Sequence, residues 1–188
     1  GQSKPIPPLS LNPTKPLSQY IIDSWSSDEG LETKTLTKVI QDEDGYLWIG
    51  SYNGLFRFDG IQFKSYTKED YPTLRTNSFT DLYQNKEGKL FTGTGGSGML
   101  KYSNNSFEIV GDTSDRFDKP IESIHFDEHE TLWIGTRGAG IFVYQNEKIE
   151  AYSASPLLSK ITVSGIITSK NGTMWFATEG NGLVSFSD

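Results

Sequence analysis

Leu47-Trp48-Ile49-Gly50 is the stretch that decides the fold, because three later stretches repeat it in phase. They are Leu90-Phe91-Thr92-Gly93, Leu132-Trp133-Ile134-Gly135 and Met174-Trp175-Phe176-Ala177. The aromatic residue recurs after 43, 42 and 42 positions. A fixed period in this range is typical of architectures in which each repeat is one supersecondary unit. The sequence therefore predicts a stacked or radial array, and such a scaffold does not reveal its ligand.

Each unit contains four short runs in which apolar and polar residues alternate, separated by turns rich in Asp, Asn and Gly. Alternation with period 2 and Gly at the turns predicts β-hairpins. Four antiparallel strands in about 42 residues match one propeller blade. We therefore predict an all-β chain, a β-propeller of about four four-stranded antiparallel blades. The expected blades cover about 36–66, 79–110, 121–152 and 163–188.

The two ends of the chain carry a second prediction. Residues 1–16 contain five of the eight prolines and are expected to form an extended arm. Propeller repeats are then expected over 17–188. The last unit ends after its third run, so we expect residues 17–25 to supply its closing outer strand. Three arrangements stay open: a four-bladed ring, part of a larger ring, or an eight-bladed ring of two copies.

Composition narrows the possible partners. The formal net charge is −7 and the pI about 4.9, so no basic stripe is available for nucleic acid or an anionic membrane surface. The chain has no Cys, which excludes disulfides and thiolate metal sites. No apolar run approaches the roughly 18 residues of a membrane span. The chain starts without Met, and we expect a mature exported segment whose signal peptide was removed.

Three motifs suggest chemistry, and each has a structural alternative. Gly93-x-Gly95-x-x-Gly98 matches a dinucleotide fingerprint, but that motif needs a following helix, so a tight turn is favoured. Asp42-x-Asp44-Gly45 hints at a calcium loop but lacks the remaining oxygen ligands, so a hairpin turn is favoured. His125 and His129 have the spacing of a zinc pair on a helix, but the segment is predicted as strand and turn. We expect an exposed pair there, and neither metal nor cofactor.

The aromatic anchors and the acidic residues also have two interpretations each. The Trp and Phe anchors are expected in the core between blades rather than as carbohydrate platforms. No Ser lies in a nucleophile elbow, and the 24 acidic residues are scattered over the turns. A paired-carboxylate site stays open, yet no two acids stand out. We expect no catalytic residue in this chain.

The first unit closely resembles the "two-component regulator propeller" repeat. The likeness rests on Val39-Ile40-Gln41-Asp42-x-Asp44-Gly45-x-Leu47-Trp48-Ile49-Gly50 and on Gly54-Leu55-x-Arg57-Phe58-Asp59-Gly60. Trp25-x-x-Asp28-Glu29-Gly30-Leu31 is similar to the stretch that opens the first blade in many such sensors. The second unit departs at Phe91-Thr92, and the third has Glu130 where the turn Gly is expected. These departures affect single blades.

The resemblance implies a periplasmic input domain of a bacterial two-component receptor. In that family the propeller precedes a β-sandwich, a membrane helix and a histidine kinase, hybrid kinase or diguanylate cyclase. The membrane would then be reached only through a C-terminal segment outside these 188 residues. Family members in gut bacteria often sense polysaccharide fragments. We therefore expect a small-molecule or oligosaccharide ligand and a dimeric receptor.

Seven residues are predicted to bind that ligand. In a propeller, the links between second and third strands share one face with the links from each fourth strand to the next blade. On that face the sequence places Tyr52, Asn53, Arg75, Asn77, Arg137, Glu179 and Asn181. Aromatic, guanidinium and amide groups suit a sugar or a uronic acid. Two rival functions are a propeller lyase, which needs a catalytic His or acid, and a platform that binds another protein.

Overall fold

Antiparallel hairpins supply most of the regular structure in the computed structural model, which describes residues 14–111, 117–152 and 158–187. Two short 3-10 turns, η1 (Leu17–Gln19) and η2 (Ser27–Glu29), precede the first strand. From Leu36 onward, the elements whose bounds lie wholly within the described ranges are β-strands. None of the described helices is long and apolar enough to cross a membrane.

Each repeat forms one sheet whose strands neighbour one another in chain order. Blade 1 contains β1 (Leu36–Gln41), β2 (Leu47–Ser51), β3 (Leu55–Phe58) and β4 (Phe63–Tyr66). Blade 2 contains β5 (Phe79–Gln84), β6 (Leu90–Thr94), β7 (Met99–Ser103) and β8 (Ser106–Ile109). Blade 3 contains β9 (Ile121–Phe126), β10 (Leu132–Thr136), β11 (Ile141–Gln145) and β12 (Lys148–Ala151). Blade 4 contains β13 (Val163–Thr168), β14 (Met174–Thr178) and β15 (Gly182–Phe186).

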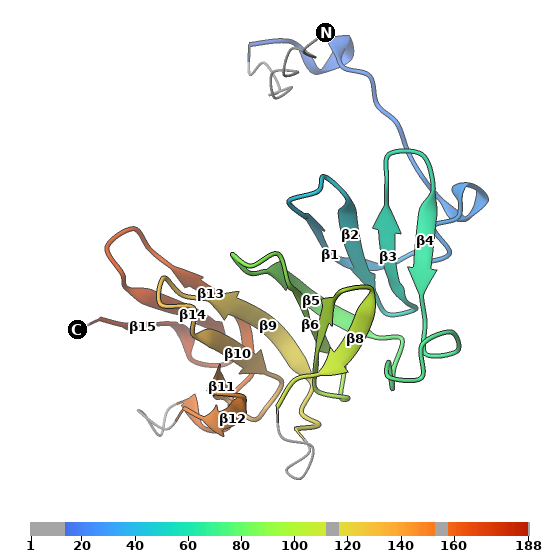
Figure 1. Cartoon of the computed structure of the whole chain (residues 1–188). Helices are drawn as coiled ribbons and strands as arrows, with labels where there is room; N and C mark the ends of the chain where they lie inside the picture. Colours follow the sequence, from blue (N-terminus) through green and yellow to red (C-terminus); the bar gives the residue numbers. More distant parts are fainter. Residues whose placement is uncertain (1–13, 112–116, 153–157, 188) are drawn as a thin grey trace, which may run out of the picture.

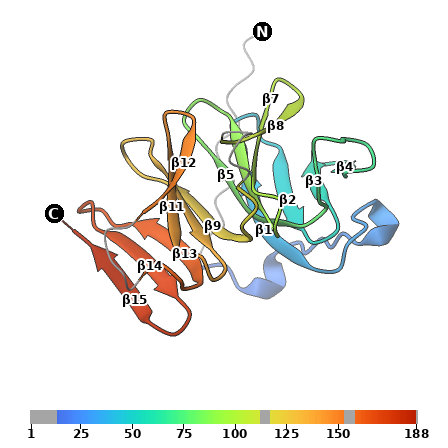
Figure 2. The same cartoon turned by 90° about the horizontal axis from the view of Figure 1, so that it is seen from below.

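The four blades follow one another along an arc, with blade 1 at one end and blade 4 at the other (Figures 1 and 2). The first strands of the blades lie on the inside of this arc, since β1 contacts β5, β5 contacts β9 and β9 contacts β13. The predicted all-β propeller architecture is confirmed. The dinucleotide interpretation of Gly93-x-Gly95-x-x-Gly98 is excluded, because β7 follows this link in place of a helix.

Residues 17–25 do not form the expected outer strand of blade 4. The segment instead runs to blade 1 (Figure 1), where the Trp25 ring packs edge-on against Phe58 with centroids 5.2 Å apart. Ser26 then caps η2 through a reciprocal capping box with Glu29, and Leu31 is buried against Phe56 and Phe58. The prediction is wrong because the apolar face of blade 1 captures the segment. Of the expected arm, residues 1–13 lie outside the described ranges.

Apolar side chains between consecutive blades form the core. Between blades 1 and 2, Trp48, Leu55 and Tyr66 pack against a cluster from blade 2 that includes Phe79 and Leu82. Corresponding clusters lie between blades 2 and 3 and between blades 3 and 4. The expectation that the aromatic anchors belong to the core between blades agrees with Trp48 and Phe91, which are buried. Each blade therefore depends on its neighbours for burial.

An Asp–Trp pair fixes the first hairpin of blades 1 and 3. The Asp42 carboxylate accepts hydrogen bonds from the Tyr46 backbone N–H and from Trp48 Nε1, both at 2.8 Å. Asp127 accepts in the same way from Trp133 Nε1 at 2.9 Å. The carboxylate thus closes the turn and orients the anchor ring six residues later. Asp42 belongs to a hairpin turn, as the sequence favoured over a calcium loop.

Asp81 joins three blades through one buried carboxylate, which is 6% exposed. Its Oδ2 accepts from the Ile124 N–H of blade 3 at 2.9 Å, and its Oδ1 accepts from the Leu82 N–H at 2.9 Å. Lys38 of blade 1 places its Nζ 2.9 Å from Oδ1. A buried carboxylate is stable only when its oxygens are satisfied in this way.

We expect Asp81→Ala to lower the free energy of unfolding by about 2–4 kcal/mol, because two buried N–H groups lose their acceptor. Lys38→Ala is the matched control. It should cost under about 1 kcal/mol, because the Lys38 side chain is 45% exposed and exposed ion pairs are weak. Urea unfolding of both variants measures the difference. Equal losses would contradict the three-blade role of Asp81.

In blades 2 to 4, the Gly that ends the link between the second and third strands has a left-handed backbone, with φ of 81° at Gly98, 80° at Gly140 and 68° at Gly182. A Cβ at Gly98 would collide with the carbonyl oxygen of Phe117. A Cβ at Gly140 would collide with the carbonyl oxygen of Leu158. No atom lies within 4 Å of a Cβ built at Gly182. The sterically required glycines are thus those that face a link to the following blade.

We expect Gly182→Ala to destabilise the fold by about 1 kcal/mol, through backbone strain alone. Gly140→Ala should cost about 2 kcal/mol more, because its Cβ also displaces the link that enters blade 4. The difference between the melting temperatures of the two variants measures how much the clash with Leu158 adds to the cost of backbone strain. Indistinguishable melting temperatures would show that the contact with Leu158 does not constrain the link.

Candidate functional site

The links between second and third strands lie beside the links that enter each blade, as the sequence predicted. Three backbone hydrogen bonds join them, from Gly95 N to Ser78 O at 3.1 Å, from Arg137 N to Pro120 O at 2.9 Å and from Glu179 N to Thr162 O at 3.0 Å. Each bond pairs the two links of one blade. These links therefore form one edge of the arc, which we call the link face. The hairpin turns between first and second strands occupy the opposite edge.

Blade 1 presents the predicted aromatic residue on the link face. The Ser51 hydroxyl donates to the Gly54 carbonyl at 2.8 Å and accepts from the Asn53 N–H at 3.0 Å, which closes a tight turn. Tyr52 at the tip of this turn is 51% exposed. Asn53 lines a hollow of about 720 Å³ together with Trp25 and the stretch 32–35. The turn therefore displays an aromatic ring and an amide side by side along the chain.

Two of the predicted ligand groups are occupied by protein partners. The Arg137 guanidinium donates through Nε to Glu122 Oε1 at 2.6 Å, and its Nη2 lies 2.6 Å from the same oxygen. Asn77 accepts from the Lys68 N–H at 2.7 Å and donates to Glu69 at 3.0 Å. Asn77 therefore shapes the link between blades 1 and 2. Sequence reasoning missed Glu122, because it lies on β9, 15 residues before its partner.

The remaining predicted residues are exposed and spread along the arc. Arg75 lies in the link between blades 1 and 2, and Glu179 and Asn181 lie in the last link of blade 4. The seven predicted residues thus share the link face but come from different blades. Tyr52, Asn53 and Arg75 are the group that blade 1 and its outgoing link bring to the same end of the face.

The inner side of the arc holds a hollow of about 440 Å³ that the sequence did not predict as a site. It is lined mainly by the first strands of the blades, including Lys38, Asp81, Tyr83, Ser123 and His125. Trp175 and Leu183 of blade 4 line the same hollow. Apolar and polar groups are therefore mixed along this surface, and the polar groups near blade 2 belong to the Asp81 interaction.

His125 is half-buried between blades, which corrects the expectation of an exposed pair. Its Nε2 lies 2.9 Å from Thr168 Oγ1 of blade 4, and its ring meets the Tyr83 ring edge-on with centroids 5.9 Å apart. The alternation of β9 places His125 opposite Trp133, where β1 has Ile40 opposite Trp48. His129 does lie exposed in the following turn, beside Glu128 at 3.7 Å.

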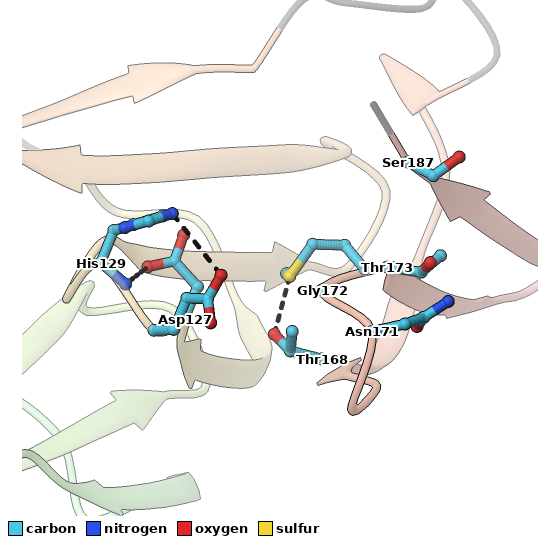
Figure 3. Close-up of a pocket in the computed structure, with 9 residues that line it drawn as sticks. Asp127, His129, Thr168, Asn171, Gly172, Thr173 and Ser187 are labelled. Atoms are coloured by element: carbon cyan, nitrogen blue, oxygen red, sulfur yellow. Dashed lines mark hydrogen bonds and ion pairs between the residues drawn. The ribbon is translucent and has the colours of Figure 1, made fainter.

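A third, polar hollow of about 430 Å³ lies between the β9–β10 turn and the β13–β14 turn (Figure 3). Asp127 and His129 lie on one side, and Thr168 and Asn171 lie on the other. The Asp127 carboxylate accepts from the His129 N–H at 2.9 Å. Across the described ranges, no group of three or more His, Asp or Glu side chains could hold a metal ion. The polar groups of Asp127 stabilise the turn at the edge opposite the link face.

Burial lowers the pKa of His125, because the charged imidazolium loses hydration, although Asp127 and Asp81 partly oppose this effect. The unfolded chain therefore binds a proton at a higher pH than the folded chain. The stabilising effect of neutral His125 is present above about pH 6.5 and is lost as the pH falls below that value.

We expect the wild type to lose more free energy of unfolding than His125→Gln between pH 7.5 and pH 5, since Gln keeps a hydrogen-bonding group but does not titrate. Urea unfolding at four pH values across this range measures both curves. Groups that titrate elsewhere affect both proteins equally. Parallel curves would show that His125 does not contribute to acid sensitivity.

Comparison with known proteins shows which family part of this sequence resembles. Residues 30–53 match the family model described as two component regulator propeller. A stretch of 49 residues is 37% identical to histidine kinase P4 of Formosa agariphila, and covers 26% of this chain and 4% of that protein. The matched family segment runs from the end of the η2 cap through the first hairpin to the Tyr52 turn.

Solved structures with low sequence identity share the fold. One, described as the extracellular domain of hybrid two component system BT3049 from B. thetaiotaomicron, superposes with a TM-score of 0.67 at 24% identity over 85% of this chain. Virginiamycin B lyase from Staphylococcus aureus gives a TM-score of 0.58 at 12% identity over 81% of this chain. The chain spans 21% of the first structure and 55% of the second. Residues 30–53 are thus similar to the two component regulator propeller family, within a chain that folds as an all-β array of four blades.

Proposed function

We propose that this chain is part of the periplasmic input region of a bacterial two-component receptor and binds a ligand without catalysing a reaction. The observation that carries the proposal is the family match over residues 30–53. The local identity to a histidine kinase supports the same role. In a dimeric receptor, the ligand would act by binding one arrangement of the two copies more tightly than the other.

The ligand that the link face suits best is an oligosaccharide that carries uronic acid. Tyr52 exposes a ring on which a sugar can stack, and Asn53 adds an amide that can donate and accept. Arg75 is exposed and can form a paired hydrogen bond with a carboxylate. Arg137 is a weaker candidate than the sequence suggested, because Glu122 already holds its guanidinium.

Several contacts favour binding over catalysis. The Nε2 of His125 is already hydrogen-bonded to Thr168, so this nitrogen has a structural partner. The carboxylates of Asp42 and Asp127 accept backbone and Trp N–H groups at both oxygens. A general base needs an open approach to the proton that it removes. These three groups are better explained as parts of turns and blade contacts.

We expect acidic oligosaccharides to raise the melting temperature of the chain. At a ligand concentration 100 times Kd, the gain is about 2.7 kcal/mol, or about 5 to 10 °C for a chain of this length. Tyr52→Ala and Arg75→Ala should each reduce this shift, whereas Lys170→Ala in the opposite turn should not. Thermal shift with neutral and uronic-acid oligosaccharides measures the effect.

The controls test three points separately: whether the ligand is acidic, whether it binds at the link face, and whether the chain only binds it or also converts it. A shift with neutral sugars that only Tyr52→Ala removes would replace the uronic acid with a neutral glycan. A shift that survives both substitutions would remove the link face as the site. Chemical turnover of the stabilising oligosaccharide would contradict the non-catalytic role and favour a lyase.

A further inference from the structure

The hollow of about 720 Å³ at the blade 1 end of the link face contains only one of the residues that the sequence predicted to bind a ligand, Asn53. Three parts of the described chain line it: the stretch 25–27 that leads into η2, the link 32–35 that enters blade 1, and Asn53 of the β2–β3 link. We call it the Trp25 hollow. Its volume lies within the range of small-molecule sites, which is about 300–1,000 Å³. It is therefore large enough to hold a ligand group of its own.

Blade 1 differs from the other blades in the contact between its two links. In blades 2 to 4, a backbone hydrogen bond joins the link between second and third strands to the link that enters the blade, as from Gly95 N to Ser78 O at 3.1 Å. Tyr52 and Thr35 occupy the equivalent positions of blade 1 in the strand register. No backbone bond joins Tyr52 to Thr35, although both lie in the described ranges. The two links of blade 1 are therefore not tied together beside the Trp25 hollow.

The stretch that leads into η2 is held in place by its own hydrogen bonds. The Ser26 backbone N–H and hydroxyl both donate to Glu29 Oε2, at 2.7 and 2.8 Å. The Leu31 N–H donates to the Ser26 carbonyl at 2.9 Å, and the Leu31 side chain is buried against Phe56 and Phe58. A wall that is already ordered loses less conformational entropy when a ligand binds to it.

Trp25 contributes a partly exposed aromatic ring to this wall. The ring meets Phe58 edge-on with centroids 5.2 Å apart, yet the residue is 46% exposed. Trp48 and Trp133 donate their indole N–H groups to aspartates at 2.8 and 2.9 Å, whereas no described residue accepts a hydrogen bond from Trp25 Nε1. Trp25 thus keeps both ring surface and an N–H donor available. This combination suits a sugar, which has apolar C–H groups and hydroxyls.

Three exposed polar side chains complete the lining, those of Glu32, Lys34 and Asn53. Within the described ranges, neither Glu32 nor Lys34 forms an ion pair, and the Asn53 amide has no hydrogen-bond partner. The formal charges of Glu32 and Lys34 cancel, so the hollow offers a charged acceptor and a charged donor without a net charge. Sugar hydroxyls can both donate and accept, and hydrogen bonds to charged groups are the stronger ones. An anionic sugar would be attracted by Lys34 and repelled by Glu32.

We propose that the Trp25 hollow binds one neutral pyranose unit of an oligosaccharide. The indole ring stacks on the sugar, Glu32 accepts hydrogen bonds from its hydroxyls, and Lys34 and Asn53 donate to them. Tyr52 directly precedes Asn53, so the neutral unit lies beside the acidic unit that the proposed function assigns to the link face. The inference rests on that proposed function and narrows the ligand to an oligosaccharide in which a uronic acid neighbours a neutral sugar.

The tryptophans of the chain allow the bound sugar to be located. Incorporation of fluorotryptophan gives one fluorine NMR signal for each of the four tryptophans, and the signal that Trp25→Phe removes is that of Trp25. We expect at least one of the neutral methyl glycosides of glucose, galactose and mannose to shift the Trp25 signal at millimolar concentration. The signals of Trp48 in the core and of Trp175 in the inner hollow should not move.

Two substitutions test the charged groups of the hollow. Glu32→Ala and Lys34→Ala should each raise the Kd of the active glycoside about 10-fold, because each removes a hydrogen bond to a charged group. Lys160→Ala is the matched control and should leave the Kd unchanged, since Lys160 is an exposed lysine in the link that enters blade 4. All three residues are exposed, so the fold should tolerate the substitutions. Titration of the Trp25 signal measures the Kd of each protein.

Four results would overturn the proposal. The first is a Trp25 signal that stays fixed with all three glycosides. The second is a shift confined to Trp175, which would place the sugar in the inner hollow. The third is a Kd that neither Glu32→Ala nor Lys34→Ala changes. The fourth is tighter binding of methyl glucuronide than of every neutral glycoside, which would make the unit in the hollow acidic.

Failure of this inference and failure of the proposed function give different results. If acidic oligosaccharides stabilise the chain through Tyr52 and Arg75 while the Trp25 signal stays fixed with every glycoside, only the Trp25 hollow is contradicted. If neutral glycosides shift the Trp25 signal but acidic oligosaccharides do not stabilise the chain, only the acidic ligand of the link face is contradicted.

Discussion

Burial between neighbouring blades is the constraint on which the rest of the structure depends. A blade with apolar side chains on its faces cannot bury them alone, so each blade depends on packing against a neighbouring blade. The clusters around Trp48, Phe91 and Ile141 satisfy this need within the arc. The fixed spacing of about 42 residues follows from it, because every repeat must return the same side chains to the same contact.

Polar contacts on the inner side then hold the blades in register. Thr37 donates its hydroxyl to the Phe79 carbonyl at 2.7 Å, and Ser123 donates to the Val163 carbonyl at 3.2 Å. Asp81 extends the same principle to three blades by accepting the Ile124 N–H. Directional bonds of this kind add specificity to an apolar contact that alone would allow sliding. The link face is consequently displayed on a rigid support, which suits the recognition of a ligand.

The sequence predicted those parts of the fold that local periodicity controls. The strands and turns follow from alternation and from the Asp–Trp spacing, which act within a few residues. The position of residues 17–25 could not be obtained this way, since spacing does not show which apolar surface will capture Trp25. The sequence also predicted that the candidate residues share the link face, because strand order alone determines which links lie at the same edge of the blades. The pairing of Arg137 with Glu122 was not, because separate elements bring these side chains together.

Trp25 and Leu31 cover the outer apolar face of blade 1, and their position in the sequence has a consequence for the order in which the blades fold. Ribosomal synthesis releases these residues before the blade that they cover, so the apolar face of blade 1 meets its cover as soon as it forms. Each later blade arrives on a surface that is already folded. Nascent repeats would then be added in order, and the surface exposed to chaperones at any moment would be confined to the most recently made blade.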